Sequence, residues 1–249
     1  MANEFPVVVT GAAGLVGGLV VAGLKDRYDL RPTDIEDGDL RDRAFVDRAI
    51  AGAGAVVHLA ANADPDTTWE HLRGPNADAV VNVLDAAARS ATVTTVVLAS
   101  SLHAMGGHLD AGRTGIGTDL PPYPCCAYGA TKVFGETLGR VYADLHGLSV
   151  RCLRLGGVAR RPEARSWLGG WLSFGDVVSL VEAALTAPPA STARYGVYHG
   201  ISANTGTMWD DATTRQELGY RPRDDSKEYA HDVTNDLENA DGARLAHLT

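Results

Sequence analysis

The stretch Thr10-Gly-Ala-Ala-Gly-Leu-Val-Gly17 decides the fold, because it lies between an apolar, strand-like run at residues 5–9 and a helical pattern at residues 15–25. A glycine-rich turn that follows a first strand and opens a helix has the placement of a dinucleotide-binding loop. The sequence therefore predicts a strand, a dinucleotide-binding turn and a helix at the start of the chain.

Each glycine of this turn has its own expected role. Gly11 permits the tight turn, Gly14 lets the backbone approach a pyrophosphate, and Gly17 permits close packing of the helix on the strand. The pyrophosphate would lie at the helix N-terminus, where free N–H groups favour anions. A merely flexible turn is the alternative, because the chain has 28 glycines. The expected cofactor-binding residues of the turn are Gly11, Ala13, Gly14, Leu15, Val16 and Gly17.

Short apolar runs alternate with longer helical patterns along the rest of the chain. The expected strands are residues 28–32, 55–59, 93–100, 149–155 and 196–201, and the expected helices are residues 42–50, 69–90, 128–145 and 176–187. Such alternation is typical of βαβ units around a parallel sheet. We therefore predict an α/β fold with a Rossmann-like, doubly wound parallel sheet and a small C-terminal substrate-binding portion.

The domain organisation follows from this pattern and from the length of the chain. A chain of 249 residues is long enough for one domain with a substantial core. We expect a single domain over residues 1–249, in which residues 1–155 mainly form the dinucleotide-binding core. Residues 156–175 and 199–249 are expected to form mainly the substrate-binding portion.

Composition and charge exclude several classes of function. The 22 basic and 31 acidic residues give a net charge of −9. This charge disfavours nucleic acid and anionic membranes as partners, because both attract a positive field. No apolar run approaches the roughly 20 residues of a membrane span, and the N-terminus lacks the pattern of a signal peptide.

The cysteines give no sign of a disulfide framework or a metal site. Cys125 and Cys126 are adjacent, and Cys152 lies within an expected strand. This spacing matches no metal-ligand motif, so no metal ion is predicted. The expected location is a reducing cytoplasm.

Asp34 follows the second expected strand, close to the spacing of about 20 residues expected for the acidic residue that holds the adenosine ribose. Its charge would repel a 2′-phosphate, so NAD is the predicted cofactor rather than NADP. A solvated acidic loop is the alternative, because Glu36, Asp37 and Asp39 are close by.

Tyr128 and Lys132 are four residues apart in an expected helix, so their side chains share one face. An ammonium group beside a phenol favours the phenolate and lowers the pKa of the tyrosine. The pair therefore predicts a base for proton transfer. The alternative is an exposed amphipathic helix that carries a lysine by chance.

Taken in order, the glycine turn, Asp39-Leu40, Leu59-Ala-Ala, Ser100-Ser101 and Tyr128-x3-Lys132 resemble the motifs of the extended short-chain dehydrogenase/reductase family. The resemblance covers roughly residues 5–160. Within that family the chain is most similar to the uronate dehydrogenases. This second resemblance rests on Ala99-Ser-Ser-Leu-His103, on residues 171–182 and on Gly200-Ile-Ser-Ala-Asn204 followed by Trp209-Asp210.

The resemblance implies catalytic roles for three residues. Tyr128 would be the general base, and Lys132 would lower its pKa and hydrogen-bond the nicotinamide ribose. Ser101, placed in the loop after the strand that ends at Ser100, would orient the substrate oxygen. The resemblance also implies that cofactor-binding positions beyond the turn are Asp34, Asp39, Leu40, Leu59, Ala60, Ala61, Asn76, Tyr128 and Lys132.

The resemblance to uronate dehydrogenases implies a site for a sugar carboxylate. Arg165 occupies the place of the arginine that binds this carboxylate, and a guanidinium fits a carboxylate with two parallel hydrogen bonds. A solvated basic loop is the alternative, because Arg160 and Arg161 are close by. His103 matches a substrate-contacting histidine, although a lone histidine is also commonly structural.

Three matched substrate positions depart from the uronate dehydrogenase pattern. Those enzymes have an asparagine where this chain has Leu102, and serines near the positions of Ala63 and Gly157. Losing polar partners changes which hydroxyl groups a site can recognise. The departures leave open an altered uronate or another polar cyclic alcohol. The matched substrate-binding positions are Ala63, Ser101, Leu102, His103, Tyr128, Gly157 and Arg165.

The sequence thus predicts an NAD-dependent oxidation at C1 of a hexuronate, such as galacturonate or glucuronate, to an aldarolactone. The alternatives are a nucleotide-sugar epimerase, another reductase of the same family and a noncatalytic redox sensor that binds a dinucleotide. A homo-oligomer is expected from the habits of the family. No nucleic acid or membrane partner is expected.

Overall fold

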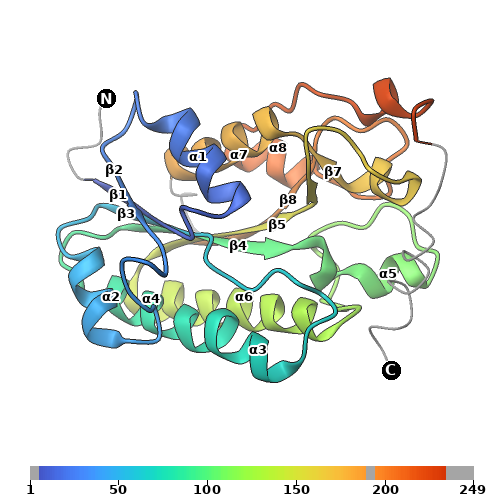
Figure 1. Cartoon of the computed structure of the whole chain (residues 1–249). Coiled ribbons are helices and arrows are strands. Elements are labelled where there is room, and N and C mark those ends of the chain that lie inside the picture. Colours follow the sequence, from blue (N-terminus) through green and yellow to red (C-terminus); the bar gives the residue numbers. More distant parts are fainter. Residues whose placement is uncertain (1–5, 189–193, 234–249) are drawn as a thin grey trace.

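The computed structural model describes residues 6–188 and 194–233 of the chain. Six parallel strands form its central sheet, in the order β2-β1-β3-β4-β5-β8 (Figure 1). The strands are β1 (Val7–Thr10), β2 (Leu30–Thr33), β3 (Ala55–His58), β4 (Thr95–Ser101), β5 (Ser149–Leu155) and β8 (Tyr195–Gly200).

Helices cover both faces of this sheet (Figure 1). One face carries α1 (Leu15–Leu24), α7 (Phe174–Thr186) and α8 (Ala212–Leu218), and the other carries α2 (Arg43–Ile50), α4 (Ala79–Arg89) and α6 (Ala127–His146). Two clusters of buried aliphatic side chains, one on each face, form the core. The predicted Rossmann-like, doubly wound α/β fold is confirmed.

The strand order places a binding crevice at the carboxyl end of β1. The chain runs outward from β1 to β2 and then returns to place β3 on the other side of β1. Ligands of doubly wound sheets bind at such a reversal, outside the carboxyl ends of the strands. The glycine turn between β1 and α1 lies at this point.

The structure divides one helix that the sequence predicted as continuous. Within residues 69–90, α3 (Trp69–Arg73) and α4 are joined by a π-helical segment, Gly74–Asp78, which contains Pro75. Proline has no N–H for the regular helical ladder, which explains the local change of winding.

The sequence did not predict the short elements of the substrate side, because they have too few residues to show periodicity. These are α5 (Gly106–Asp110), β6 (Gly157–Val158), β7 (Trp171–Leu172) and the 3₁₀ turns η2 (Leu102–Ala104), η3 (Arg165–Gly170) and η4 (Ser226–Tyr229).

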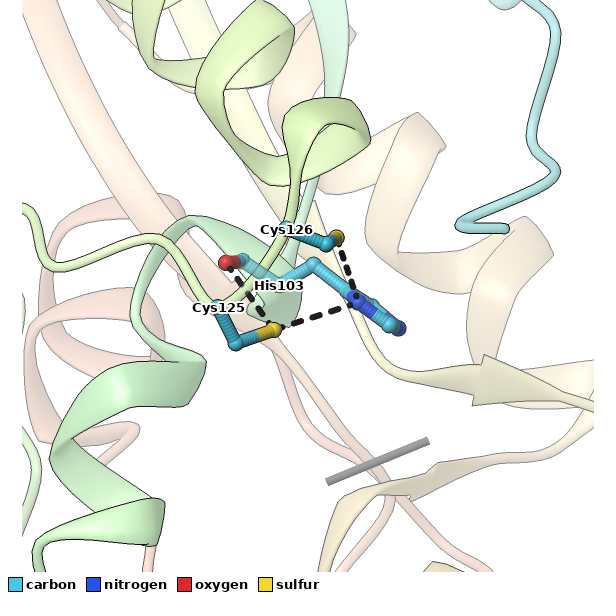
Figure 2. Close-up of side chains that lie close together, drawn as sticks. All are labelled: His103, Cys125 and Cys126. Atoms are coloured by element: carbon cyan, nitrogen blue, oxygen red, sulfur yellow. Dashed lines mark hydrogen bonds between the residues drawn. The ribbon is translucent and has the colours of Figure 1, made fainter. Parts of the chain in front are cut away.

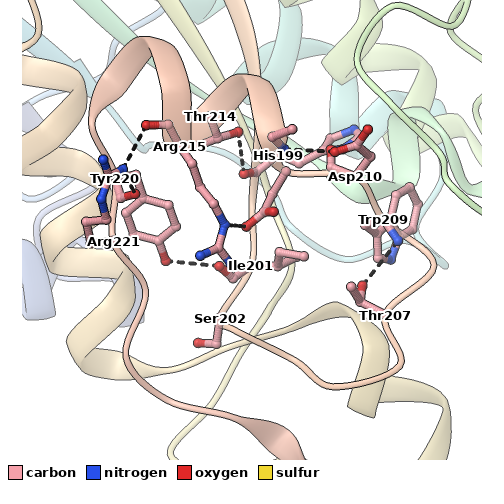
Figure 3. A network of polar contacts seen from close by, with 12 residues as sticks. His199, Ile201, Ser202, Thr207, Trp209, Asp210, Thr214, Arg215, Tyr220 and Arg221 are labelled. Carbon is pink, nitrogen blue, oxygen red and sulfur yellow. Dashed lines mark hydrogen bonds and ion pairs between the residues drawn. The ribbon is translucent and has the colours of Figure 1, made fainter.

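A hydrogen-bond network attaches the segment after β8 to the sheet (Figure 3). His199 Nδ1 lies 3.0 Å from the carbonyl oxygen of Asp210, and the Thr214 hydroxyl donates to the His199 carbonyl at 2.9 Å. The Tyr220 hydroxyl donates to the carbonyl of Ile201 at 3.0 Å. These contacts fix the backbone of this segment beside the carboxyl end of β8.

Some predicted regions lie outside the described residues. Phe5, the expected start of the first strand, is one, and residues 234–249 of the expected substrate-binding portion are another. Among the helices of the described ranges, none combines the length and the apolar character that a membrane span requires.

Candidate active site

The glycine turn is shaped by close backbone contacts. Gly11 has a φ of +71°, and a Cβ on it would lie 2.6 Å from the backbone nitrogen of Ala60. A Cβ on Gly17 would lie 2.0 Å from the carbonyl oxygen of Gly11. Both positions therefore exclude a side chain. A Cβ on Gly14 would lie 3.3 Å from the Gly11 carbonyl oxygen, so packing within the turn excludes a side chain there less strictly. The absence of a side chain at Gly14 instead lets a ligand approach the backbone.

The N-terminus of α1 is open to an anion. Gly14 is the N-cap, and no side chain caps this end of the helix. Ala13, Gly14 and Leu15 are exposed there, and Leu15 keeps 57% of its surface accessible although it is apolar. Uncapped N–H groups at an exposed helix N-terminus suit a pyrophosphate. The residues at the end of β1 therefore fit a dinucleotide.

Asp34 lies directly beside this turn. One carboxylate oxygen accepts a hydrogen bond from the Ala13 N–H at 2.7 Å, and the other accepts one from the Ile35 N–H at 2.7 Å. The structure thus brings the acidic residue after β2 to the glycine turn after β1, as the spacing predicted. It does not leave Asp34 in a solvated loop remote from the crevice.

Asp39 and Leu40 lie farther along the same edge. Asp39 forms an ion pair with Arg41 at 2.5 Å, and hydrogen bonds from Arg41 lower the pKa of the Asp39 carboxyl. The Leu40 carbonyl accepts a hydrogen bond from Asn82 Nδ2 at 3.0 Å. Asp39 and Leu40 are placed so that a bound adenine would lie beside them. The contacts that they make here are with Arg41 and Asn82 of the same chain.

The segment after β3 is held against α6 by Asn76. Asn76 Nδ2 donates to the Asn62 carbonyl at 2.9 Å and lies 3.2 Å from the Thr131 hydroxyl. Leu59, Ala60 and Ala61 therefore run between the glycine turn and α6, where the middle of an extended dinucleotide would pass. Ala63, just beyond them, is exposed.

Ser101, Tyr128 and Lys132 come together beyond this segment. Ser101 is the last residue of β4 and does not lie in the loop after it, as the sequence had suggested, because β4 pairs with β5 as far as Leu155. The Ser101 side chain interacts with that of Tyr128, and its oxygen accepts a hydrogen bond from the His103 N–H at 3.2 Å. Lys132 Nζ donates to the Ala99 carbonyl at 3.1 Å and lies 5.3 Å from the centroid of the Tyr128 ring.

The electrostatics of the pair differ from the prediction. Burial raises the pKa of Tyr128 to about 12, although the interaction with Ser101 opposes this change. Burial likewise lowers the pKa of Lys132 to about 8, against the attraction of Glu136. The expected lowering of the tyrosine pKa by Lys132 is therefore wrong for this structure. Desolvation of the buried phenol is the largest cause of the raised pKa, and the neighbouring Cys126 adds to it.

A buried charge network behind Lys132 was not predicted. Arg154 and Glu136 form two hydrogen bonds of 2.8 Å, and the Ser100 hydroxyl donates to the same carboxylate at 2.5 Å. Each of these residues leaves less than 5% of its surface exposed. Glu136 lies four residues after Lys132, so helical spacing could have indicated that the two interact.

Two of the remaining predicted substrate positions are packed against other side chains. Leu102 is buried in an apolar cluster with Ile116, Ile201 and Trp209. Gly157 lies under a tryptophan, because a Cβ on it would be 2.8 Å from Trp167 Cε3.

Arg165 is exposed at the start of η3 and donates through Nε to the Val233 carbonyl at 3.2 Å. Its guanidinium is therefore accessible to a ligand, which is compatible with the predicted role and also with a solvated loop.

His103 lies next to Tyr128 and to two cysteines. The rings of His103 and Tyr128 are in edge contact at 5.5 Å. Figure 2 shows that the His103 ring also lies close to the Cys125 and Cys126 sulfurs, and Nδ1 is 3.4 Å from each. A hydrogen bond from Cys125 lowers the pKa of the Cys126 thiol, with further contributions from His103 and the Gly129 N–H, whereas burial opposes the change.

Comparison with known proteins agrees with this geometry. The model of the NAD dependent epimerase/dehydratase family matches residues 7–159. The chain belongs to this family. The match spans the glycine turn, Asp34, Ser101, Tyr128 and Lys132, and the residues at the end of β1 fit the cofactor that the family uses.

The individual relatives include dehydrogenases named for a sugar and for a sugar acid. The chain is 35% identical to an L-arabinose 1-dehydrogenase (NAD(P)(+)) of Haloferax volcanii, over 88% of this chain and 97% of that protein. It is 30% identical to a uronate dehydrogenase of Pseudomonas putida, over 90% of this chain and 85% of the relative. The structure is similar to that of a mutant uronate dehydrogenase from Agrobacterium tumefaciens complexed with NAD, with a TM-score of 0.82 and 28% identity over 94% and 91% of the two chains.

These findings confirm the predicted family, NAD as the cofactor, and a dehydrogenase that acts on a CH–OH group. They do not identify the alcohol that this chain oxidises, because one relative is named for L-arabinose and the other for uronate.

Proposed function

We propose that the protein oxidises the C1 hydroxyl of a hexuronate, such as galacturonate or glucuronate, to an aldarolactone. The observation that carries the proposal is the assembly of Ser101, Tyr128 and Lys132 in a chain whose glycine turn, hydrogen-bonded to Asp34, suits a dinucleotide. NAD, when bound, accepts the hydride from C1.

The chain itself supplies proton transfer and orientation. The Tyr128 phenolate, formed by loss of the phenol proton before the step, takes the proton of the C1 hydroxyl and becomes a neutral phenol. The C1–H bond breaks at the same time, its electron pair leaves as hydride, and the C=O bond of the lactone forms. The Ser101 hydroxyl fixes the substrate oxygen against Tyr128. The Lys132 ammonium, 5.3 Å from the centroid of the Tyr128 ring, stabilises the phenolate before it takes the proton. Positioned proton transfer contributes typically about 10²–10⁴-fold to the rate.

In the proposed site, one set of residues contacts the cofactor and a separate set contacts the substrate. The glycine-turn residues and Asp34, Asp39, Leu40, Leu59, Ala60, Ala61 and Asn76 would contact or frame NAD. Arg165 would bind the uronate carboxylate, and His103 would donate to or accept from the sugar. Support for Arg165 is its exposure and the strength of bidentate guanidinium–carboxylate pairs.

A second candidate is oxidation of a neutral aldose at C1. It is favoured by the apolar surroundings of Leu102 and by Trp167 over Gly157, which leave few polar partners for a sugar acid. The arabinose dehydrogenase relative points the same way.

The test is the formation of NADH with galacturonate, glucuronate and L-arabinose. A hexuronate dehydrogenase gives a kcat/KM at least 10-fold higher for an acid than for arabinose. Higher activity on arabinose than on either acid would replace the first proposal by the second. An epimerase would convert a nucleotide sugar without net NADH.

Arg165 separates the two candidates more sharply. If it binds a carboxylate, Arg165→Ala raises the KM for the uronate by about 10–100-fold and leaves the KM for a neutral sugar unchanged. Arg161→Ala, an exposed arginine of the same loop, is the matched control. Equal effects of both variants on both sugars would refute a carboxylate site at Arg165.

We also propose that the chain forms homo-oligomers through α6. Phe134, Val141 and Leu145 are 42%, 44% and 74% exposed, and their spacing places them along one face of this helix. Light scattering should show an oligomer for the wild type and a smaller species for Phe134→Glu. A wild-type monomer would refute this interface.

A further inference from the structure

Three metal-ligating atoms meet at the N-terminus of α6, outside the proton-transfer group (Figure 2). The Nδ1 atom of His103 and the sulfurs of Cys125 and Cys126 all lie within 4.8 Å of one another. Both cysteines are buried, and His103 is half-buried. The cluster joins residues 22 and 23 positions apart in the chain, so the adjacent cysteines alone gave no sign of it.

The distances within this cluster fit hydrogen bonds and also fit ligation of one ion. The Cys125 thiol lies 3.7 Å from the His103 carbonyl oxygen, to which it can donate, as well as close to Nδ1. An imidazole Nδ1 has a single position, either an N–H or a lone pair, yet both sulfurs are 3.4 Å from it. A tetrahedral ion with Zn–N of about 2.0–2.1 Å and Zn–S of about 2.3 Å separates the nitrogen from each sulfur by about 3.5 Å. The observed nitrogen–sulfur separations of 3.4 Å are close to this value.

The surrounding backbone holds the two sulfurs in place. A Cβ on Gly106 would lie 2.4 Å from the Cys125 sulfur, so only glycine leaves room for that thiol. The Cys126 sulfur accepts a hydrogen bond from the Gly129 N–H at 3.3 Å. Ligands that are fixed before an ion arrives lower the cost of binding it.

A disulfide between the two cysteines is a poorer use of the same atoms. Consecutive Cα atoms are about 3.8 Å apart across a trans peptide, whereas disulfides usually join Cα atoms about 4.4–6.8 Å apart. A disulfide would also leave His103 without a role in the cluster.

We propose that His103 Nδ1, Cys125 Sγ and Cys126 Sγ bind one thiophilic metal ion of the Zn²⁺ class, whose fourth ligand would be a water molecule. Thiolate and imidazole are the ligands that such ions prefer. Because His103 is in contact with Tyr128, an ion bound here takes the imidazole away from the substrate. The ion is therefore an inhibitor that competes with the sugar. Only this kinetic consequence rests on the proposed function.

Binding is tested without any substrate. The purified, fully reduced protein is titrated with Co²⁺ in a buffer free of thiols and oxygen, and thiolate-to-cobalt charge-transfer absorption is followed. We expect one Co²⁺ per chain, displaced by an equimolar amount of Zn²⁺. No charge-transfer band, together with no heat of Zn²⁺ binding in a calorimeter, would overturn the proposal.

The variants locate the site. Cys125→Ser, Cys126→Ser and His103→Ala should each weaken binding at least 10-fold. Cys152→Ser is the matched control, because that thiol is buried in β5, away from the cluster, and binding should be unchanged. Serine preserves the capping position at residue 126, so this variant keeps the start of α6. Equal binding by all four variants would overturn the assignment.

The effect of the ion on catalysis is measured with NAD and the sugar. Zn²⁺ should raise the KM for the sugar without changing kcat, and a chelator should reverse the effect. In Cys126→Ser the same inhibition should need at least 10-fold more Zn²⁺. If the ion binds at the three ligands and the KM does not change, competition with substrate is refuted. If no sugar is oxidised, the proposed function fails, whereas the binding measurements still decide the metal site.

Discussion

The nucleotide end and the substrate end of this molecule are built in different ways. At the nucleotide end, backbone atoms define the site. Gly11 and Gly17 are required because the chain passes within 3 Å of where their side chains would be. At the substrate end, side chains from distant segments define it, such as Trp167 over Gly157 and Trp209 against Leu102. A backbone-built site leaves a local motif in the sequence, whereas a site built by packing does not.

Among these variants, Gly11→Ala should have the largest effect on NAD binding. A β-carbon at a φ of +71° and 2.6 Å from the Ala60 nitrogen should lower the free energy of unfolding by about 1–3 kcal/mol. Displacement of the turn should weaken NAD binding by about 100-fold. Gly18→Ala is the control, because its nearest contact is 3.8 Å and its position is helical. Equal NAD affinity in both variants, measured by calorimetry, would show that the turn does not hold the cofactor.

Lys132 should make stability depend on pH. Its pKa is about 8 in the folded protein and about 10.4 in an unfolded chain. The unfolded state therefore binds more protons between these values, and the free energy of unfolding rises with pH. The gap corresponds to about 3 kcal/mol at most.

Denaturant unfolding of wild type and Lys132→Met between pH 7 and 9.5 measures this contribution. The wild type should gain stability relative to the variant as pH rises. Lys25→Met, at an exposed lysine, should show no such trend. The window stops below pH 10, because the raised pKa of Tyr128 makes the folded state lose stability above that pH. A constant difference across the window would mean that Lys132 is not desolvated.

Gly157→Ser tests whether packing defines the substrate end. The new side chain would meet Trp167 at 2.8 Å, so the free energy of unfolding should fall by about 1–3 kcal/mol and the KM for the sugar should change. Gly169→Ser, whose nearest contact is 3.6 Å, should cost less. A stable Gly157→Ser variant with improved uronate oxidation would show that Trp167 adapts and that the missing serine alone limits the acid.

The smallest of these effects is expected for Asp34→Ala. Removing the carboxylate should lower the ratio of kcat/KM for NAD to that for NADP by about 10-fold. Glu36→Ala, an exposed acidic residue two positions on, is the control. An unchanged ratio would mean that Asp34 accepts the hydrogen bond from the Ala13 N–H but does not distinguish NAD from NADP.

The sequence was sufficient to predict those elements that a local pattern of residues indicates. The alternation of apolar runs and helices predicted the sheet, and Asp34 is beside the glycine turn as its spacing suggested. Tyr128 and Lys132 share one face of α6 because helical spacing is local. Their pKa values could not be predicted in this way, since desolvation depends on every element packed around them.

The substrate side was predicted less well for the same reason. Leu102 was expected at a substrate position, and the structure buries it with Ile116, Ile201 and Trp209. The approach of His103 to Cys125 and Cys126 joins segments more than 20 residues apart. No periodicity or short motif reports such contacts.

Proton transfer by Tyr128 is tested by measuring NADH formation and NAD binding in Tyr128→Phe. The phenylalanine ring keeps the packing of the buried tyrosine and removes only the oxygen that accepts the proton. Turnover of the sugar should fall by about 10²–10⁴-fold, while the dissociation constant for NAD should change by less than about 3-fold. Turnover that persists at the wild-type rate would contradict proton transfer by Tyr128.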